Sequence, residues 1–217
     1  PAVKLQPLLS LKNKKYLYDE DMVNFQKKNL IDIKSPNPSV ETFLHAFLPF
    51  KFVDHTHSDA IMNVTNRPDG LKFSKEIFGK KAAIVPYVMP GFALARKINE
   101  VYSTNPNVNC LILMNHGIFT FANNAKDAYD LMIKYVSKAE KEVKKLKSKK
   151  IKQIKFSKNK FKPHDVAPIL RGLLSENKDQ KFVLNFRSNK KLNYFINGKT
   201  VKTYSSKGTA TPDHVIR

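Results

Sequence analysis

Residues 110–122 read CLILMNHGIFTFA, two short apolar runs on either side of a polar turn. Apolar runs of this length, bounded by asparagine and glycine, are typical of buried strands. Gly117 tolerates backbone conformations that other residues avoid, so we expect the chain to bend or bulge within the turn. The stretch therefore predicts two buried strands, Cys110 to Met114 and Ile118 to Phe121, with His116 at the end of the first.

Two further strands are predicted upstream, and each leads toward a helix. The first runs from Phe50 to His55, and the segment HTHSDAIMNVTN at residues 55–66 has the pattern of a turn into a helix. The second runs from Ala83 to Val88, and apolar residues then recur at helical spacing from Phe92 to Tyr102. Together with residues 110–122, the sequence predicts four strands.

A short helix is predicted just before the first strand. Ser39, which follows Pro38, is a favourable N-cap residue, and apolar residues recur at helical spacing until Pro49 ends the helix. This interpretation puts Glu41 in the first turn of a helix.

The second half of the chain begins with the longest predicted helix, an amphipathic stretch from Ala125 to about Lys147. The lysine run KKLKSKKIKQIKFSKNKFK at residues 144–162 is interpreted as a solvated helix end and a linker. From Pro163 we expect a small α+β unit. Its predicted elements are a helix from Ala167 to Leu174, a strand from Lys181 to Phe186, and a hairpin from Leu192 to Tyr204 that turns at Asn197-Gly198.

The chain of 217 residues, 41% of them apolar, is long enough to bury a sizeable core. Residues 1–37 are polar and weakly periodic, with a helix candidate around Asp19 to Phe25, and are interpreted as a connecting segment. Residues 38–150 are predicted to form the main domain. Residues 151–217 are predicted to form the basic linker and the small C-terminal unit.

The net charge of +21 raises nucleic acid or an anionic membrane as partners. Only five of the 39 basic residues are arginine, the residue that nucleic-acid readers use for bidentate contacts. We therefore expect a solvated lysine surface and no nucleic-acid or membrane partner. No run of 18 apolar residues occurs, which favours a cytoplasmic protein, and the single cysteine, Cys110, is expected to be a buried, inert thiol.

Three histidines are the candidate metal ligands. His55 and His57 are two residues apart at the end of a predicted strand, so both side chains project from the same face. His116 lies at a second strand end. Three neutral imidazoles and an open position are a common arrangement for catalytic zinc. The alternative is that the pair His55 and His57 is exposed, or is satisfied within the core without a metal.

Other polar residues receive simpler interpretations. Asp54 points to the opposite face of the strand from His55 and is expected to be a surface or outer-sphere carboxylate. His45, four residues after Glu41, either packs or hydrogen-bonds to Glu41, and packing is preferred. His164 is expected to be solvated, and His214 has no local explanation.

Three separated motifs resemble the class II aldolase/adducin domain over roughly residues 35–145. They are NPSVETFLHAFLPFKFVDHTHSDAI, then PYVMPG, then CLILMNHGIFTFANNAKDAYDLM. The stretches LHAFLPF, VDHTH and TPDHVIR are most similar to long bacterial enzymes that join a rhamnulose-1-phosphate aldolase region to an alcohol dehydrogenase domain.

The resemblance implies a three-layer α/β/α fold with a central, mainly antiparallel sheet, and a homotetramer. It implies that His55, His57 and His116 bind a divalent metal, zinc first, and that Glu41 is the catalytic acid/base. The implied reaction is retro-aldol cleavage of a sugar phosphate such as L-rhamnulose 1-phosphate to dihydroxyacetone phosphate and L-lactaldehyde. Such a reaction uses the metal as a Lewis acid.

Two departures from the family pattern affect this interpretation. The chain has no glycine before Gly70, whereas family members bind the substrate phosphate with glycine-containing loops upstream of the glutamate motif. Either the chain is part of a longer protein, which we prefer, or it does not act on phosphorylated sugars. No glycine pattern of a dinucleotide-binding loop occurs, so no dehydrogenase activity is expected from these residues. A sugar-phosphate epimerase or dehydratase, and an adducin-like scaffold, remain as alternatives.

Overall fold

The computed structural model of the protein describes residues 1–146, 150–154, 161–175, 182–211 and 214. The chain forms two compact units. Unit 1 comprises Pro1–Lys147 and Thr209–Arg217, and unit 2 comprises Ser148–Gly208. The last residues of the chain therefore belong to unit 1, although unit 2 precedes them in sequence.

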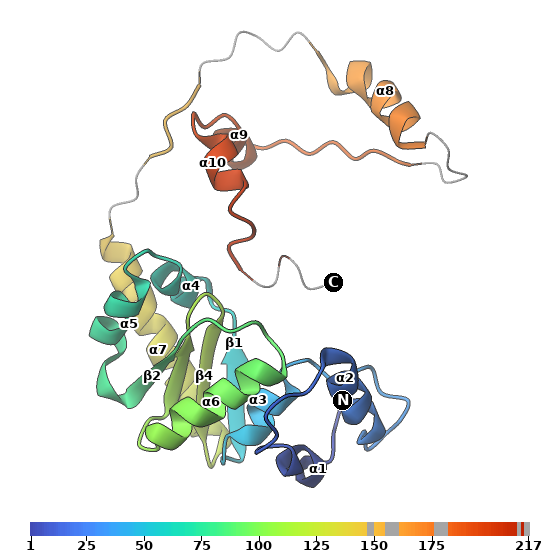
Figure 1. Ribbon diagram of the computed structural model, residues 1–217. Coiled ribbons are helices and arrows are strands. Elements are labelled where there is room, and N and C mark those ends of the chain that lie inside the picture. The colour runs from blue at the N-terminus through green and yellow to red at the C-terminus, as the bar shows by residue number, and fades with distance from the viewer. Residues whose placement is uncertain (147–149, 155–160, 176–181, 212–213, 215–217) are drawn as a thin grey trace. The chain divides into compact units, whose positions relative to one another are not determined.

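A four-stranded sheet lies at the centre of unit 1 (Figure 1). Its strands are β1 Phe52–Thr56, β2 Ala82–Val85, β3 Cys110–Leu113 and β4 Gly117–Ala122, in the order β1-β4-β3-β2. Strand β4 pairs antiparallel with β1 and with β3, and β2 pairs parallel with β3. The mainly antiparallel sheet is confirmed. Strand β2 ends earlier than predicted, because Pro86 follows Val85 and has no N–H to continue the ladder.

Helices cover both faces of the sheet, so the predicted three-layer α/β/α fold is confirmed (Figure 1). One face packs against α3 Thr42–Phe47 and α6 Phe92–Thr104, and the other against α4 Asp59–Thr65, α5 Gly70–Phe78 and α7 Ala125–Lys145. Successive strand residues alternate between the two cores. Leu111, Leu113, Phe119 and Phe121 join the first core, and Cys110, Ile112 and Ile118 join the second.

The first 37 residues carry two helices, α1 Leu5–Ser10 and α2 Asp19–Lys28. Leu8 of α1 and Met22 of α2 are buried in the same core as α3 and α6. The predicted helix around Asp19 to Phe25 is confirmed and extends to Lys28, whereas α1, α5 and the short 3-10 helix η1 Gly79–Lys81 were not predicted. This part of the chain thus contributes apolar side chains to the main core.

Unit 2 corrects two predictions. Its helices are α8 Pro163–Ser175, which confirms the helix predicted from Ala167, α9 Lys190–Ile196 and α10 Val201–Ser205. The predicted strand is wrong for residues 182–186, which form no regular element, and Lys181 lies outside the described residues. The predicted hairpin from Leu192 to Tyr204 is also wrong. Asn189 caps α9 by accepting a hydrogen bond from the backbone N–H of Leu192 at 2.8 Å, so the Asn197-Gly198 turn joins two helices.

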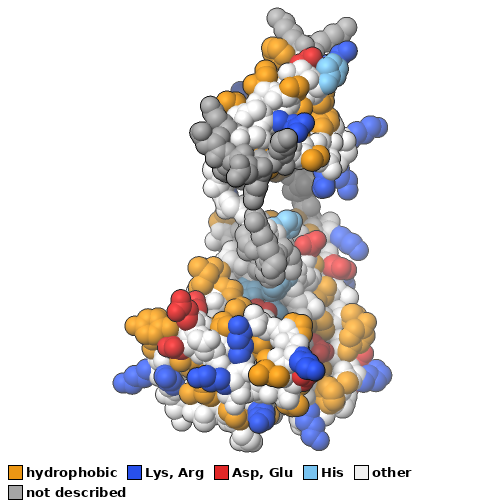
Figure 2. Space-filling model, turned by 90° about the vertical axis from the view of Figure 1, so that its right-hand side faces the viewer, with side chains coloured by type: hydrophobic (Ala, Val, Ile, Leu, Met, Phe, Trp, Pro, Cys, Tyr) orange, Lys and Arg blue, Asp and Glu red, His pale blue; other side chains and the backbone are white. Residues whose placement is uncertain are grey.

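Within the described residues, no helix is long and apolar enough to cross a membrane. On the face shown in Figure 2, Lys and Arg side chains are spread among acidic and apolar side chains and do not gather into one basic patch.

One buried hydrogen bond joins the sheet to its longest helix. The hydroxyl of Thr120, which is fully buried in β4, donates to the backbone oxygen of Ala128 in α7 at 2.9 Å. We expect Thr120→Val to lower the free energy of unfolding by about 1 kcal/mol, the usual net effect of one lost hydrogen bond. Urea denaturation measures it. The same change at the exposed Thr104 serves as the control, and equal stabilities for the two variants would contradict the prediction.

Candidate metal centre

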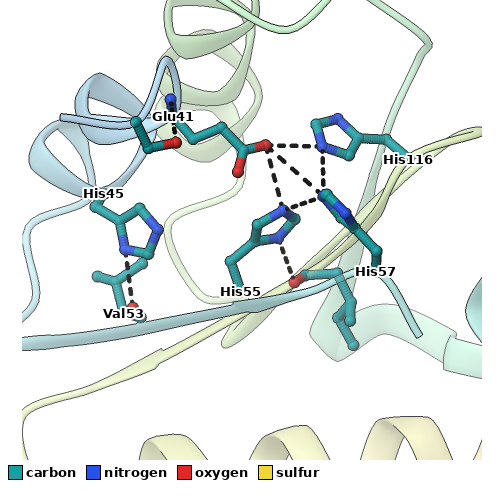
Figure 3. A network of polar contacts seen from close by, with 8 residues as sticks. Glu41, His45, Val53, His55, His57 and His116 are labelled. Atoms are coloured by element: carbon teal, nitrogen blue, oxygen red, sulfur yellow. Dashed lines mark hydrogen bonds and ion pairs between the residues drawn. The ribbon is translucent and has the colours of Figure 1, made fainter. Parts of the chain in front are cut away.

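Glu41 lies at the N-terminus of α3. The helix begins at Thr42, and Glu41 is its N-cap residue, so the predicted position in the first turn is one residue off. The backbone N–H of Glu41 donates to Oγ of Ser39 at 3.1 Å, and the backbone oxygen of Glu41 accepts from the N–H of Leu44 at 2.9 Å. These bonds fix the Glu41 backbone, and its side chain extends toward the histidines at the sheet (Figure 3).

His55 and His57 come from β1 and from the residue that follows its last position. His55 lies on the face that packs against α3, and its ring stacks on Phe119, with centroids 4.1 Å apart and an interplanar angle of 12°. Nδ1 of His55 donates to the backbone oxygen of Ile118 at 2.9 Å. Because a carbonyl can only accept, Nδ1 carries a proton, so Nε2 offers a lone pair to a metal when the ring is neutral and donates to Glu41 when the ring is protonated.

His116 lies in the tight turn between β3 and β4. Asn115 adopts a left-handed conformation, with φ of 58°, which is the one positive φ among the described residues other than glycine. Gly117 follows at a point of close approach, because a Cβ there would collide with the backbone oxygen of Thr56 and lie 3.1 Å from Cε1 of His55. The turn therefore brings His116 against the end of β1.

The four side chains converge on one point (Figure 3). Nε2 of His57 lies 2.9 Å from Nε2 of His55 and 3.1 Å from Nε2 of His116. Oε1 of Glu41 lies 2.8 Å from Nε2 of His116, 3.3 Å from that of His55 and 3.9 Å from that of His57. The side chains are largely buried, with exposed fractions from 3% for His116 to 16% for Glu41.

This donor set fits a divalent metal. Ligands at the roughly 2.0 to 2.1 Å of zinc–nitrogen bonds occupy the corners of a tetrahedron with edges of about 3.3 to 3.4 Å, close to the spacings in this cluster. Nε2 of His55 lies 2.9 Å from Nε2 of His57, and two neutral rings with lone pairs at that distance would repel unless a proton or a cation lay between them. A metal ion would satisfy all four groups together.

The charge state of Glu41 suits this role. Burial alone would raise the pKa of the Glu41 carboxyl, but hydrogen bonds with His116 and His55 outweigh it. The net effect holds the pKa well below its ordinary value, so the side chain is a carboxylate at neutral pH.

The remaining candidates lie outside the cluster. Nδ1 of His45 donates to the backbone oxygen of Val53 at 2.9 Å and not to Glu41, so His45 ties α3 to β1 (Figure 3). Asp54 lies on the opposite face of β1, as predicted from the alternation. His164 is 74% exposed beside Asp165 in unit 2, and Nδ1 of His214 lies 2.6 Å from Oγ1 of Thr211.

Three residues that support the cluster were not predicted from the sequence. Phe119 stacks on His55, and the side-chain N–H of Asn115 donates to Oδ1 of Asn66 at 3.0 Å. Asn115 could have been identified, because asparagine before His-Gly in a short turn is one of the few residues that tolerates a positive φ. Asn66 and Phe119 could not, since their contacts depend on tertiary structure.

Residues 10–143 match the family model described as the Class II Aldolase and Adducin N-terminal domain, and residues 162–217 match the one described as Aldolase class II, second domain. A curated relative, named uncharacterized oxidoreductase YuxG, from Bacillus subtilis (strain 168), is 32% identical over 225 residues. The alignment covers 99% of this chain and 32% of that protein, so the chain spans about a third of the relative's length.

A solved structure with the same fold is the N-terminal class II aldolase domain of a conserved protein from Thermoplasma acidophilum. It is 38% identical in sequence, with 65% of each chain covered and a TM-score of 0.61.

We expect purified protein to carry one divalent metal ion per chain, with His55→Ala and His116→Ala each weakening metal binding. Loss of a ligand should exceed the roughly 10- to 100-fold effect of losing an outer hydrogen bond. Metal analysis and titration with a competing chelator measure both quantities. His164→Ala, at an exposed site, serves as the control. Metal-free wild type, or full binding by both variants, would show that the cluster is not a metal site.

Metal affinity should fall as the pH is lowered from about 8 to about 5, the range in which histidine ordinarily takes up a proton. The metal binds neutral imidazole, so protons compete with it. Glu41 adds nothing to this dependence, because its lowered pKa keeps it ionised across the range. The slope of log K against pH should approach three at the acidic end and not exceed it, and an affinity independent of pH would rule out imidazole ligands.

Proposed function

The chain belongs to the class II aldolase and adducin family, and from this premise we propose that it is the metal-binding region of a sugar-phosphate aldolase. The reaction is retro-aldol cleavage of a ketose 1-phosphate, with L-rhamnulose 1-phosphate as the first candidate and dihydroxyacetone phosphate and L-lactaldehyde as products. The metal is zinc, held by His55, His57 and His116. The observation that carries the proposal is the convergence of three Nε2 atoms and one carboxylate oxygen within 4.8 Å of one another.

The reaction requires stabilisation of a developing negative charge and the transfer of protons. Cleavage breaks the C3–C4 bond, C4 becomes the aldehyde carbon as its hydroxyl loses a proton, and negative charge develops on the three-carbon fragment. A divalent ion, when bound, withdraws charge from the ketone oxygen as a Lewis acid. The three-carbon fragment must then take up a proton at C3, the carbon whose bond has broken. Glu41, a carboxylate at neutral pH, is our candidate to accept the proton from the C4 hydroxyl and then to deliver a proton to C3, a role typically worth about 10² to 10⁴ in rate.

The histidines orient this site. The hydrogen bond from Nδ1 of His55 to Ile118 fixes the ring so that Nε2 faces Glu41, and the stack on Phe119 fixes the ring plane. In Figure 2, pale blue histidine side chains are visible on this face of unit 1. The low exposure of the four side chains limits access of water to the reacting atoms.

Two other functions of this site can be distinguished from that of an aldolase. A sugar-phosphate epimerase or dehydratase on this fold would use the same three histidines with a different proton-transfer group. An adducin-like scaffold would not need metal ligands, and the presence of all three histidines with Glu41 favours an enzyme over a scaffold. The oligomer we propose by resemblance is a homotetramer with sites shared between subunits.

The name of the Bacillus relative concerns a protein about three times as long. A dehydrogenase of the Rossmann type binds its dinucleotide with a G-x-G-x-x-G loop, and no such pattern occurs in this sequence. We propose that such an activity, if the full-length protein has it, resides in other residues than these.

The decisive assay offers L-rhamnulose 1-phosphate and L-fuculose 1-phosphate to the metal-loaded full-length protein and measures dihydroxyacetone phosphate. Unphosphorylated L-rhamnulose tests whether the phosphate is required. We expect Glu41→Gln to lower kcat by about 10² to 10⁴ and to retain the metal, because the glutamine oxygen preserves a neutral donor. Glu140→Gln, on the exposed side of α7, is the matched control. No product from any of these sugars would reject the aldolase and leave the epimerase, dehydratase and scaffold readings.

A further inference from the structure

The side chain of Asn66 joins three segments of unit 1. Asn66 is the C-cap residue of α4, the helix that begins two residues after His57. Its Oδ1 accepts from the side-chain N–H of Asn115 at 3.0 Å, and its own side-chain N–H donates to the backbone oxygen of Ala210 at 2.8 Å. One carboxamide thus uses its acceptor on the turn that carries His116 and its donor on the tail of the chain.

The tail in question is residues 209–211, which follow unit 2 but belong to unit 1. Thr211 is only 7% exposed, and its hydroxyl lies 2.6 Å from Nδ1 of His214. Thr211 is buried although it lies in no helix or strand, and Asn66 bonds to the preceding Ala210, so this segment is docked on unit 1. The hydrogen bond from the Asn66 side chain to the backbone oxygen of Ala210 holds the backbone of this segment in place.

His116 depends on its turn more than His55 depends on β1. His55 is anchored by the bond from Nδ1 to Ile118 and by the stack on Phe119. Nδ1 of His116 is buried without a hydrogen-bond partner among the described residues. The orientation of the His116 ring therefore follows from the backbone of the turn, where Asn115 holds a left-handed conformation that most residues avoid.

We propose that Asn66 is a positioning residue that links the tail of residues 209–211 to the turn carrying His116, so that docking of the tail and binding of a metal ion strengthen each other. The inference rests on the metal site of the proposed function and goes beyond it. Coupling between two sites is reciprocal, so if the docked tail tightens metal binding, the metal must stabilise the docked tail by the same factor.

Two variants separate the two bonds. Asn115→Gly keeps the left-handed backbone, which glycine adopts readily, and removes only the bond from the turn to Asn66. Asn66→Ala removes both bonds. Asn63→Ala, on the same helix, is the matched control, because among the described residues its side chain bonds only to the backbone oxygen of Asp59 and not to Asn115 or Ala210.

Two measurements on the full chain test the coupling. The first is the affinity for Co²⁺, followed by the visible absorption that reports the geometry of a cobalt site. The second is hydrogen exchange of a peptide that covers residues 208–211, with and without Co²⁺. We expect Asn115→Gly and Asn66→Ala to raise Kd about threefold to tenfold, the effect of one or two lost hydrogen bonds. We expect Co²⁺ to slow hydrogen exchange of residues 208–211 in wild type and in Asn63→Ala. We expect no such slowing in Asn115→Gly or Asn66→Ala.

The outcomes are distinct. If wild type binds no Co²⁺, the metal site itself fails, and this inference fails with it. If wild type binds Co²⁺ but tail exchange is the same with and without the ion, only the coupling is overturned. Wild-type affinity in Asn115→Gly also overturns it, and this variant leaves α4 untouched should Asn66→Ala fold poorly.

Discussion

The pairing of β1 with β4 is the constraint on which the site depends. The two strands are about 60 residues apart in sequence, and their antiparallel register sets His55 opposite Phe119 and Thr56 opposite Ile118. That register puts the end of β1 beside the turn that precedes β4, so His57 and His116 meet there. A slip of one residue would turn His55 to the opposite face of the sheet, away from Glu41. Gly117 reinforces the register, because any larger residue would push β4 away from Thr56.

The second element of the site is α3, which packs on one face of the same sheet. Phe43, Leu44 and Phe47 bury α3 in the core, and the face they cover is the one on which His55 lies. Burial of this kind stabilises the position of α3 through apolar area, so Glu41 is held near the histidines by hydrophobic packing as well as by polar contacts. The carboxylate is stabilised by its neighbours in turn, since the bonds to His116 and His55 outweigh the cost of burial.

Strong periodicity allowed much of unit 1 to be predicted from sequence. Runs such as Cys110 to Leu113 are apolar on both faces because both faces are covered, and Ala125 to Lys145 has a clear helical stripe. In unit 2, α8 was predicted, whereas α9 and α10 were not, because they are short helices of seven and five residues that bury no side chain and so carry little helical periodicity. Leu192 to Ile196 fits both alternation and helical spacing, and the cap by Asn189 decides for the helix.

In the candidate site, too, some residues could be predicted from sequence and others could not. The histidines were predicted as ligands from their types and spacing, and Glu41 from the resemblance to the family. Asn66 was not predicted, because its partners at Asn115 and Ala210 are 49 and 144 residues away. No local pattern encodes a bond between such distant segments. The stack of His55 on Phe119 is likewise a product of strand register, which becomes evident only when β1 and β4 are paired.

The absence of sulfur from the cluster has a consequence for oxidative stress. The four donors are imidazole nitrogens and a carboxylate oxygen, which peroxides attack far less readily than thiolates. The single thiol, Cys110, is fully buried in β3, and burial raises its pKa well above the ordinary value, so it remains protonated and unreactive. A metal ion held by these residues would therefore stay bound under oxidising conditions that empty thiolate sites.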